Sequence, residues 1–222
     1  MAYMVSSTQE KTFHILGIIH RDKNNGRIIG DCLNMIRPQL ITLEFSRYGL
    51  MFRKEKGPLY RKKIESVLSQ MRQCGEVFND EAVYSLNAYI NLPSEYEAAS
   101  LYCNENGASL HLVDMDLFSY MKLKNADELF SEENIRSIIR RRDDHTSSHE
   151  RVMARLFFNS GIQVAPYTEE MRIRDKYMGH RISKLLQDRK NRRITHITGW
   201  QHLKDPCNVF TPFHPIRVFP YD

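Results

Sequence analysis

The sequence predicts an α/β fold with a mostly parallel central sheet covered by helices. Four short apolar runs rich in β-branched residues are typical of buried strands, and they span residues 12–19, 40–43, 109–113 and 194–198. Long helical stretches separate these runs, and connections of that length join parallel strands. Strands as apolar as these also fit a sheet that is covered on both faces.

The stretches between the strands carry start and stop signals for helices. We expect helices over residues 58–73, 81–90, 94–104, 131–142, 150–158 and 168–190. Gly75 and Gly107 follow two of them, where a left-handed residue commonly ends a helix. Ser94 to Glu97 has the pattern of a capping box, and Thr168 is placed to cap the last helix. Residues 161–166 predict a turn.

A length of 222 residues suits one domain, or one domain with an insertion. We expect a flexible N-terminus over residues 1–11 and a single α/β domain over 12–222, with 117–166 as a helical insertion or lid. The four scattered cysteines lack a CxxC pair, which favours a reduced, cytoplasmic protein. No signal peptide is visible, and no apolar run is long enough to cross a bilayer, so no membrane partner is expected.

The chain is basic, with a net charge of +5 and a pI of about 9.0. The excess is clustered in residues 53–63, 140–142 and 189–193. Acidic residues follow the second cluster at once, and aromatic residues do not interleave with the basic ones as a stacking platform requires. The pattern therefore favours solvated faces over a nucleic-acid-binding surface.

The pattern His-Ile-x-Gly-x-x-His occurs twice, at residues 14–20 and 196–202. Each copy ends a predicted strand, so each presents a glycine and then a histidine, His20 or His202, just past the strand. Ligands of an open parallel sheet bind outside the carboxyl ends of its strands. We therefore expect His20 and His202 to share one site. His14 and His196 lie inside strands, where core histidines with backbone partners are expected.

Charged side chains follow the other two strands. Glu44 ends the second, and Asp114 and Asp116 follow the third. Arg174 is four residues before Met178, on the apolar face of the last predicted helix, and a buried arginine needs a partner. A strand-end carboxylate is the expected partner. A buried arginine–aspartate clamp without chemistry is the alternative that the sequence leaves open.

Two neutral imidazoles and a carboxylate form a common open site for a catalytic divalent metal. His20 and His202 would be ligands, and Glu44 would be a third ligand or the general base. The ion would be a divalent transition metal such as Mn, Co or Zn. His145 and His149 have helical ligand spacing but lie in a very polar segment, which indicates the surface.

An ordered set of short segments extends this pattern along nearly the whole chain: Gly17–His20, Arg37–Glu44 with Arg47, Glu95–Ala99, Gly107–Asp114, Arg174–Met178 and Gly199–Leu203. In this set the chain resembles the TraB/PrgY/Tiki family of the EreA/ChaN-like superfamily. Met115 departs from the family pattern, which usually has arginine there.

The resemblance implies an EreA/ChaN-like α/β fold with both GxxH motifs in one site. It adds Glu95 to the candidates, so the predicted catalytic residues are Glu44, Glu95, Asp114 and Arg174, and the predicted metal ligands are His20, Glu44 and His202. Because Tiki proteins are metal-dependent peptidases, we expect a metal-dependent hydrolase acting on a peptide or a small molecule.

Two alternatives remain open at this point. One is a non-catalytic protein that binds a peptide or haem in the same cleft. The other is an esterase-like hydrolase that uses histidine and glutamate as a general base without metal. The sequence is compatible with a homo-oligomer and does not specify one.

Overall fold

The computed structural model describes residues 11–20, 22–140, 153–154, 167–188 and 193–221. The described elements, in chain order, are β1 (Thr12–Ile18), α1 (Asn25–Ile36), β2 (Leu40–Leu43), α2 (Arg47–Gln73), α3 (Asp80–Ile90), α4 (Ser94–Asn106), β3 (Ser109–Leu112), α5 (Asp116–Leu123), α6 (Ala126–Leu129), α7 (Glu132–Arg140), α9 (Glu169–Leu186), β4 (Arg193–Gly199), the 3-10 helices η1 (Trp200–Lys204) and η2 (Thr211–Phe213), and β5 (Ile216–Val218).

In the described part of the chain, the strands form a five-stranded sheet in the order β3-β2-β4-β1-β5, and every neighbouring pair is parallel. This confirms the predicted α/β fold with a parallel sheet. The first and fourth strands come from opposite ends of the sequence but lie side by side, with Gly17 opposite Thr198 and Ile18 opposite Gly199. The two histidine motifs therefore leave the sheet at adjacent positions on the same edge.

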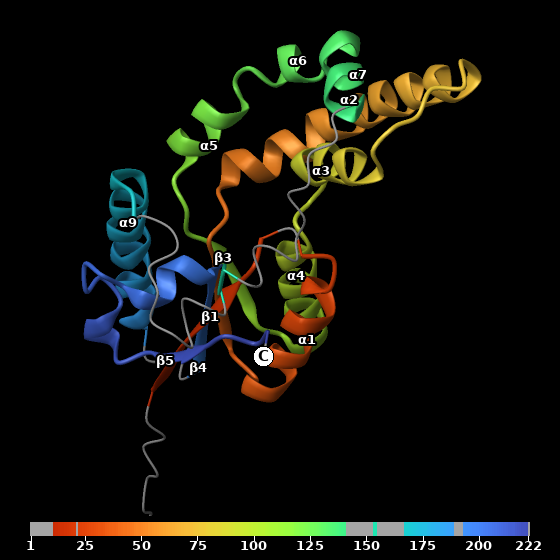
Figure 1. Ribbon diagram of the computed structural model, residues 1–222. Coiled ribbons are helices and arrows are strands. Elements are labelled where there is room, and N and C mark those ends of the chain that lie inside the picture. Colours follow the sequence, from red (N-terminus) through yellow and green to blue (C-terminus); the bar gives the residue numbers. More distant parts are fainter. Residues whose placement is uncertain (1–10, 21, 141–152, 155–166, 189–192, 222) are drawn as a thin grey trace, which may run out of the picture.

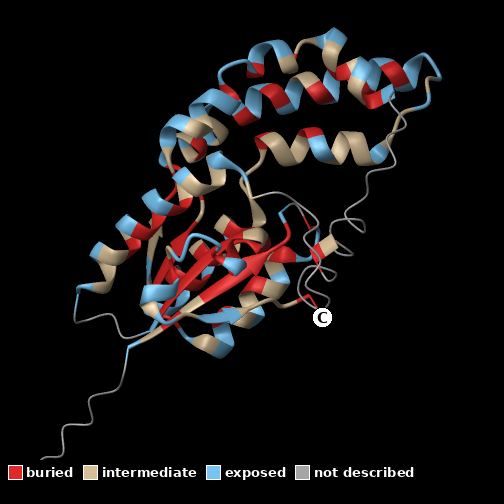
Figure 2. Ribbon diagram, turned by 60° about the vertical axis from the view of Figure 1, so that its left-hand side comes forward, coloured by how far each residue is buried: buried red, intermediate tan, exposed pale blue. Residues whose placement is uncertain are grey.

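Helices cover both faces of the sheet (Figure 1). On one face, α1 and α4 pack against apolar strand side chains, with Leu33 and Ala99 fully buried. On the other face, α9 and the segment after β4 bury Met178, Ile182 and Phe210. The strands β1, β2 and β4 are buried along nearly their whole length (Figure 2), which explains why they are apolar runs without alternation, whereas the edge strands β3 and β5 are partly exposed.

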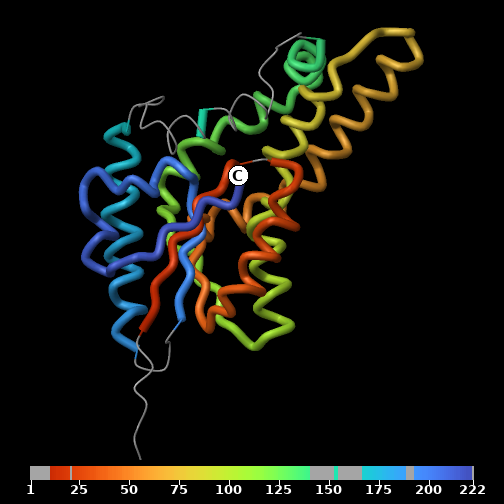
Figure 3. Tube along the Cα trace, turned by 60° about the horizontal axis from the view of Figure 1, so that its bottom comes forward, coloured from red at the N-terminus to blue at the C-terminus, as the bar shows by residue number. Residues whose placement is uncertain are grey.

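The remaining helices form an arm that projects beyond the carboxyl end of the sheet (Figures 1 and 3). The arm consists of α2, α3, α5, α6 and α7 and has its own core, in which the stacked rings of Tyr60 and Phe130 have centroids 4.6 Å apart. The described part of the predicted insertion, α5 to α7, packs on α2 and α3 within this arm. No described helix is long and apolar enough to cross a membrane.

Several local predictions need correction. The second helix begins at Arg47, well before the predicted Pro58, because the Ser46 hydroxyl accepts a hydrogen bond from the Gly49 N–H (2.8 Å) and caps it. Pro58 then lies inside the helix, where it cannot donate a backbone hydrogen bond. The predicted capping box is wrong, because Ser94 is already the first residue of α4 and Pro93 occupies the cap position.

Other expectations are met or fall outside the described residues. The Thr168 hydroxyl accepts from the Met171 N–H (3.2 Å), as a helix cap should, and Gly107 ends α4 with φ of 66°. The strand β5 was not predicted, because three half-exposed residues carry no periodicity. The predicted N-terminal tail, the turn at 161–166, most of the helix at 150–158, and the pair His145 and His149 lie outside the described residues.

Candidate functional site

A cleft of about 510 Å³ lies between the carboxyl end of the sheet and the helical arm. Its floor includes two strand-end residues, His20 after β1 and Glu44 after β2. Its walls come from α2, α3 and the start of α4, and comprise Phe45, Arg53, Tyr84, Asn87, Ala88, Asn91, Leu92, Pro93, Ser94, Glu95 and Glu97. The predicted position of the site, at the carboxyl ends of parallel strands, thus coincides with a cleft.

Glu44 is the centre of a buried network of charges. Its Oε2 accepts hydrogen bonds from the Thr198 hydroxyl (2.5 Å) and the Gly199 N–H (2.8 Å). Its Oε1 accepts from Nη2 of Arg174 (2.5 Å) and lies 3.4 Å from Nε2 of His202. Burial would raise the pKa of this carboxyl, but the positive charges of His202 and Arg174 outweigh burial and hold its pKa well below the usual range.

Arg174 joins this network to the end of β3. Its guanidinium donates two hydrogen bonds to Asp114, from Nε to Oδ1 (3.0 Å) and from Nη2 to Oδ2 (2.8 Å). The arginine side chain is only 14% exposed, so burial of its charge requires these partners. The inward arginine and its strand-end carboxylates are therefore where the sequence predicted them.

His202 is buried between two carboxylates. Its Nδ1 forms an ion pair with Oδ1 of Asp175 at 2.6 Å, and its Nε2 faces Glu44. Burial lowers the pKa of this histidine, but the nearby charges of Glu44 and Asp175 outweigh burial and raise the pKa to about 10. The ring is therefore an imidazolium at neutral pH. The hydroxyl of Tyr167 donates to the other oxygen of Asp175 (2.5 Å).

Asp175 is the site residue that the sequence analysis missed. It is fully buried on α9, next to Arg174 in sequence. A signal was present, because Asp175 is three residues before Met178 and seven before Ile182, on the apolar face of the helix. A charged residue at such a position needs a buried partner, and here the partner is His202.

His20 is the more accessible of the two motif histidines. Its side chain is 46% exposed and lines the cleft, and its Nδ1 lies 3.3 Å from Oε1 of the buried Glu95. Burial would raise the pKa of Glu95, but the hydrogen bond and charge of His20 outweigh burial and lower it. Glu95, which was a candidate only through the family resemblance, is therefore the direct partner of His20.

Both histidine rings lie against the same glycine. A Cβ on Gly199 would be 2.8 Å from Nε2 of His20 and 3.6 Å from Cδ2 of His202. Only a residue without a side chain lets the His20 ring come this close to the end of β4. The structure thus brings together His20, Glu44 and His202, with Glu95, Asp114 and Arg174 around them.

The side chains predicted as metal ligands do not fit an ion as they are arranged. Both ring nitrogens of His202 face carboxylates, Glu44 and Asp175, so an ion bound to this ring would first have to displace a proton. Both oxygens of Glu44 already accept hydrogen bonds. Within the described ranges, no group of three His, Cys, Asp or Glu side chains is placed to hold a metal ion.

Three other residues that the sequence singled out have structural roles. Asp116 accepts a hydrogen bond from the Tyr48 N–H (2.8 Å), away from the charge network. His196 is a core histidine, as predicted: its Nδ1 lies 3.0 Å from the Thr42 hydroxyl, and burial lowers its pKa to about 4. Trp200 is 3% exposed and packs in the main core.

The C-terminus holds the loop that carries His20. The hydroxyl of Tyr221 accepts a hydrogen bond from the Ile19 N–H (3.2 Å) and donates to Oδ1 of Asn25. Asn25 in turn donates from Nδ2 to the Ile19 carbonyl (2.8 Å). Both backbone groups of the residue before His20 are therefore fixed by side chains.

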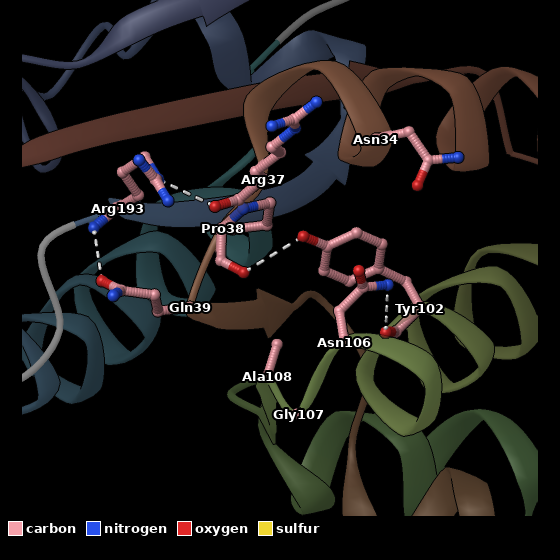
Figure 4. Close-up of a pocket in the computed structure, with 9 residues that line it drawn as sticks. All are labelled: Asn34, Arg37, Pro38, Gln39, Tyr102, Asn106, Gly107, Ala108 and Arg193. Carbon is pink, nitrogen blue, oxygen red and sulfur yellow. Dashed lines mark hydrogen bonds between the residues drawn. The ribbon is translucent and has the colours of Figure 1, made fainter.

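A second cavity, of about 590 Å³, lies at the opposite end of the sheet, where β2, β3 and β4 begin (Figure 4). Two polar side chains of this cavity, Arg193 and Tyr102, donate hydrogen bonds to backbone carbonyls just before β2. Nε of Arg193 donates to the Arg37 carbonyl (2.9 Å), and the Tyr102 hydroxyl donates to the Pro38 carbonyl (3.4 Å) (Figure 4). None of the predicted site residues lines this second cavity.

Comparisons with known proteins add no family. A scan against protein-family models finds no match, and searches of curated proteins and of solved structures also find none. The resemblance to the TraB/PrgY/Tiki family therefore stays a prediction from the motifs, and the function has to be argued from the site itself.

Proposed function

We propose that this chain is a hydrolase that activates water in the histidine cleft, with His20 as the general base. The observation that carries the proposal is the contact between His20 and Glu95. A half-exposed imidazole lines a cleft while its Nδ1 lies 3.3 Å from a buried carboxylate. This is the arrangement by which proteins orient a histidine for proton transfer.

The chemistry follows from the tautomer that Glu95 favours. If Nδ1–H donates to Oε1 of Glu95, the lone pair of His20 is on Nε2. Nε2 takes a proton from water as the water oxygen attacks a substrate carbonyl, and the negative charge of Glu95 stabilises the imidazolium that forms. The same proton then passes to the leaving group, so His20 ends as it began.

Glu44 is better suited to holding the site together than to acting as the base. A carboxyl whose pKa is far below its usual range is a weak proton acceptor. Its four contacts instead join β2 to the end of β4, to α9 and to His202. We assign Glu44, Arg174 and His202 to the rigid support of the cleft.

The lining of the cleft supports a peptide as substrate. The side-chain amides of Asn87 and Asn91 line the cleft, where Nδ2 of Asn87 donates to the Val83 carbonyl (2.9 Å) and Oδ1 of Asn91 accepts from Arg61 (2.5 Å). The other polar atom of each amide suits a peptide group, and the rings of Phe45 and Tyr84 provide apolar surface. A peptidase is therefore the form of the proposal that we test first, with small esters as the second substrate class.

The metal-dependent form is a second candidate, and the charge balance of the site favours it. Four carboxylates, Glu44, Glu95, Asp114 and Asp175, pair with three side chains that are positive when protonated, Arg174, His202 and His20, and Arg53 also lines the cleft. When His20 is neutral, as a metal ligand must be, a divalent cation would supply the positive charge that Glu95 then lacks. His20, Glu44 and His202 would hold it only if His202 lost its ring proton and Glu44 gave up part of its hydrogen bonding.

The test is hydrolysis of a fluorogenic peptide library and of small esters, each with a chelator or with added Mn²⁺, Co²⁺ or Zn²⁺. We expect His20→Ala and Glu95→Gln to lower kcat/KM by about 10²-fold or more. The matched control is His180→Ala, an exposed histidine on α9 outside the site. Activity that survives His20→Ala would contradict the general-base assignment.

Two further outcomes separate the alternatives. The metal-dependent form predicts that the chelator abolishes activity and that one of the metals restores it. It also predicts that His202→Ala no longer binds the metal. No turnover of any substrate, with or without metal, would reject the hydrolase and favour a non-catalytic protein that binds a peptide or haem in the cleft, which a haem absorption band would reveal.

A further inference from the structure

β3 is an edge strand of the sheet that the described residues form. β3 pairs with β2 through the N–H groups of Ser109 and Val113, which donate to the carbonyls of Gln39 and Leu43 (3.0 Å each). In a parallel strand both backbone groups of a residue point to the same side, and the side alternates along the strand. The N–H and C=O groups of Leu110 and Leu112 therefore point away from β2, and no strand of the described chain pairs with that edge.

A groove of about 480 Å³ runs beside this edge. Three of its lining residues belong to the strand itself, Leu110, His111 and Leu112. Its other walls are residues of α2, of α4 and of α9: Arg47, Leu50, Tyr96, Ser100, Cys103, Asn104 and Arg181, together with Ala108. A free strand edge at the bottom of a groove is the geometry of sites that take an extended peptide as an added strand.

The groove is positively charged. Arg47 and Arg181 both line it, and among the described residues that form its walls there is no carboxylate. Both arginines line the groove together with His111. Burial lowers the pKa of His111, and the charges of Arg181 and Arg47 lower it further. The guanidinium of Arg181 lies over the Tyr177 ring, 5.8 Å from its centroid, so a neighbouring ring orients it.

We propose that the edge of β3 binds an extended acidic peptide segment of a partner protein, which adds to the sheet as a sixth strand. Its backbone would bond to the outward groups of Leu110 and Leu112, and its carboxylates would meet Arg47 and Arg181. A second copy of this chain fits less well, because pairing β3 with itself brings two sets of arginines together.

The site is separate from the hydrolytic cleft. Phe45 lines the cleft and Tyr96 lines the groove, and their rings, with centroids 5.8 Å apart, form part of the wall between them. Peptide binding at β3 can therefore be present or absent whatever the chemistry of His20 proves to be.

The test uses a fluorescent peptide of about eight residues that alternates valine and glutamate, and measures anisotropy with the full-length protein. Two control peptides have lysine in place of glutamate, or N-methyl groups on alternate residues that block backbone pairing. We expect the affinity of both control peptides to be lower by a factor of about ten or more. In hydrogen exchange, the amides of Leu110 and Leu112 should slow when the acidic peptide binds.

Charge reversal locates the peptide. Arg181→Glu should weaken binding of the acidic peptide about tenfold. Arg217→Glu, on the opposite edge strand β5, should leave it unchanged. Equal binding of the N-methylated peptide, no effect of Arg181→Glu, or a stable dimer by sedimentation with slowed amides at Leu110 and Leu112 would each overturn the proposal.

Discussion

Nδ1 of His202 lies 2.6 Å from Oδ1 of Asp175, and this ion pair connects the segment after β4 to α9. Both residues are buried, Asp175 completely. The pair keeps His202 protonated, because the ring loses its hydration but gains two carboxylates. The protonation of His202 thus depends on a residue that lies outside both GxxH motifs.

Replacing Asp175 with asparagine should lower the pKa of His202, because the ring then faces only the charge of Glu44. The pKa is measured from the ring resonances of His202 by NMR titration. Asp31→Asn, an exposed aspartate of α1, is the control and should change nothing at His202. An unchanged His202 titration in Asp175→Asn would contradict the ion pair.

Stability should fall on the alkaline side. The pKa of His202 rises from 6.5 to about 10 on folding, so its contribution is complete below pH about 6.5 and is lost as pH approaches 10. Urea unfolding at several pH values measures this fall, and His202→Gln should flatten it relative to the original protein. Parallel pH profiles for the two proteins would rule out a charged His202.

Arg174→Ala should destabilise the fold by about 3 to 5 kcal/mol, because it leaves the buried carboxylates of Glu44 and Asp114 without their cation. Arg172→Ala removes an exposed arginine of the same helix that pairs with Glu169, and it should have no measurable effect. Urea unfolding of both variants gives the comparison. If Arg174→Ala and Arg172→Ala lowered the free energy of unfolding by the same amount, the buried charge network would add nothing to stability.

Gly199→Ala should keep the fold but displace His20, because the new Cβ would lie 2.8 Å from Nε2 of a ring that can rotate away. We expect a lower kcat and a shifted His20 titration. Gly30→Ala, in α1 with no atom within 4 Å of the added Cβ, is the control. It should stabilise the protein by about 0.5 to 1 kcal/mol and leave His20 unchanged.

Tyr221→Phe should cost about 1 to 3 kcal/mol, because the buried Ile19 N–H and Asn25 Oδ1 lose a partner. Since the Ile19 backbone precedes His20, the pH profile of hydrolysis should also shift. Tyr120→Phe, whose ring is 50% exposed, is the matched control. A stability loss without any change in the pH profile would limit Tyr221 to a structural role.

The sequence by itself determined four of the five described strands and the edge on which the site lies. Its four apolar runs match β1 to β4 within one residue at each end. For β1, β2 and β4 this match is expected, because a strand covered on both faces is apolar throughout. It also determined that His20, Glu44, His202 and Arg174 come together, because parallel strands carry all their carboxyl ends to one edge.

Only the tertiary structure decided how those side chains are paired. That His20 is tied to Glu95 while His202 is tied to Asp175 depends on where α4 and α9 pack, which short-range patterns do not encode. The protonation of His202 is likewise set by burial between two carboxylates from distant segments. The repeated motif fixes where the two histidines emerge, and the helices packed around them make one accessible and the other a buried cation.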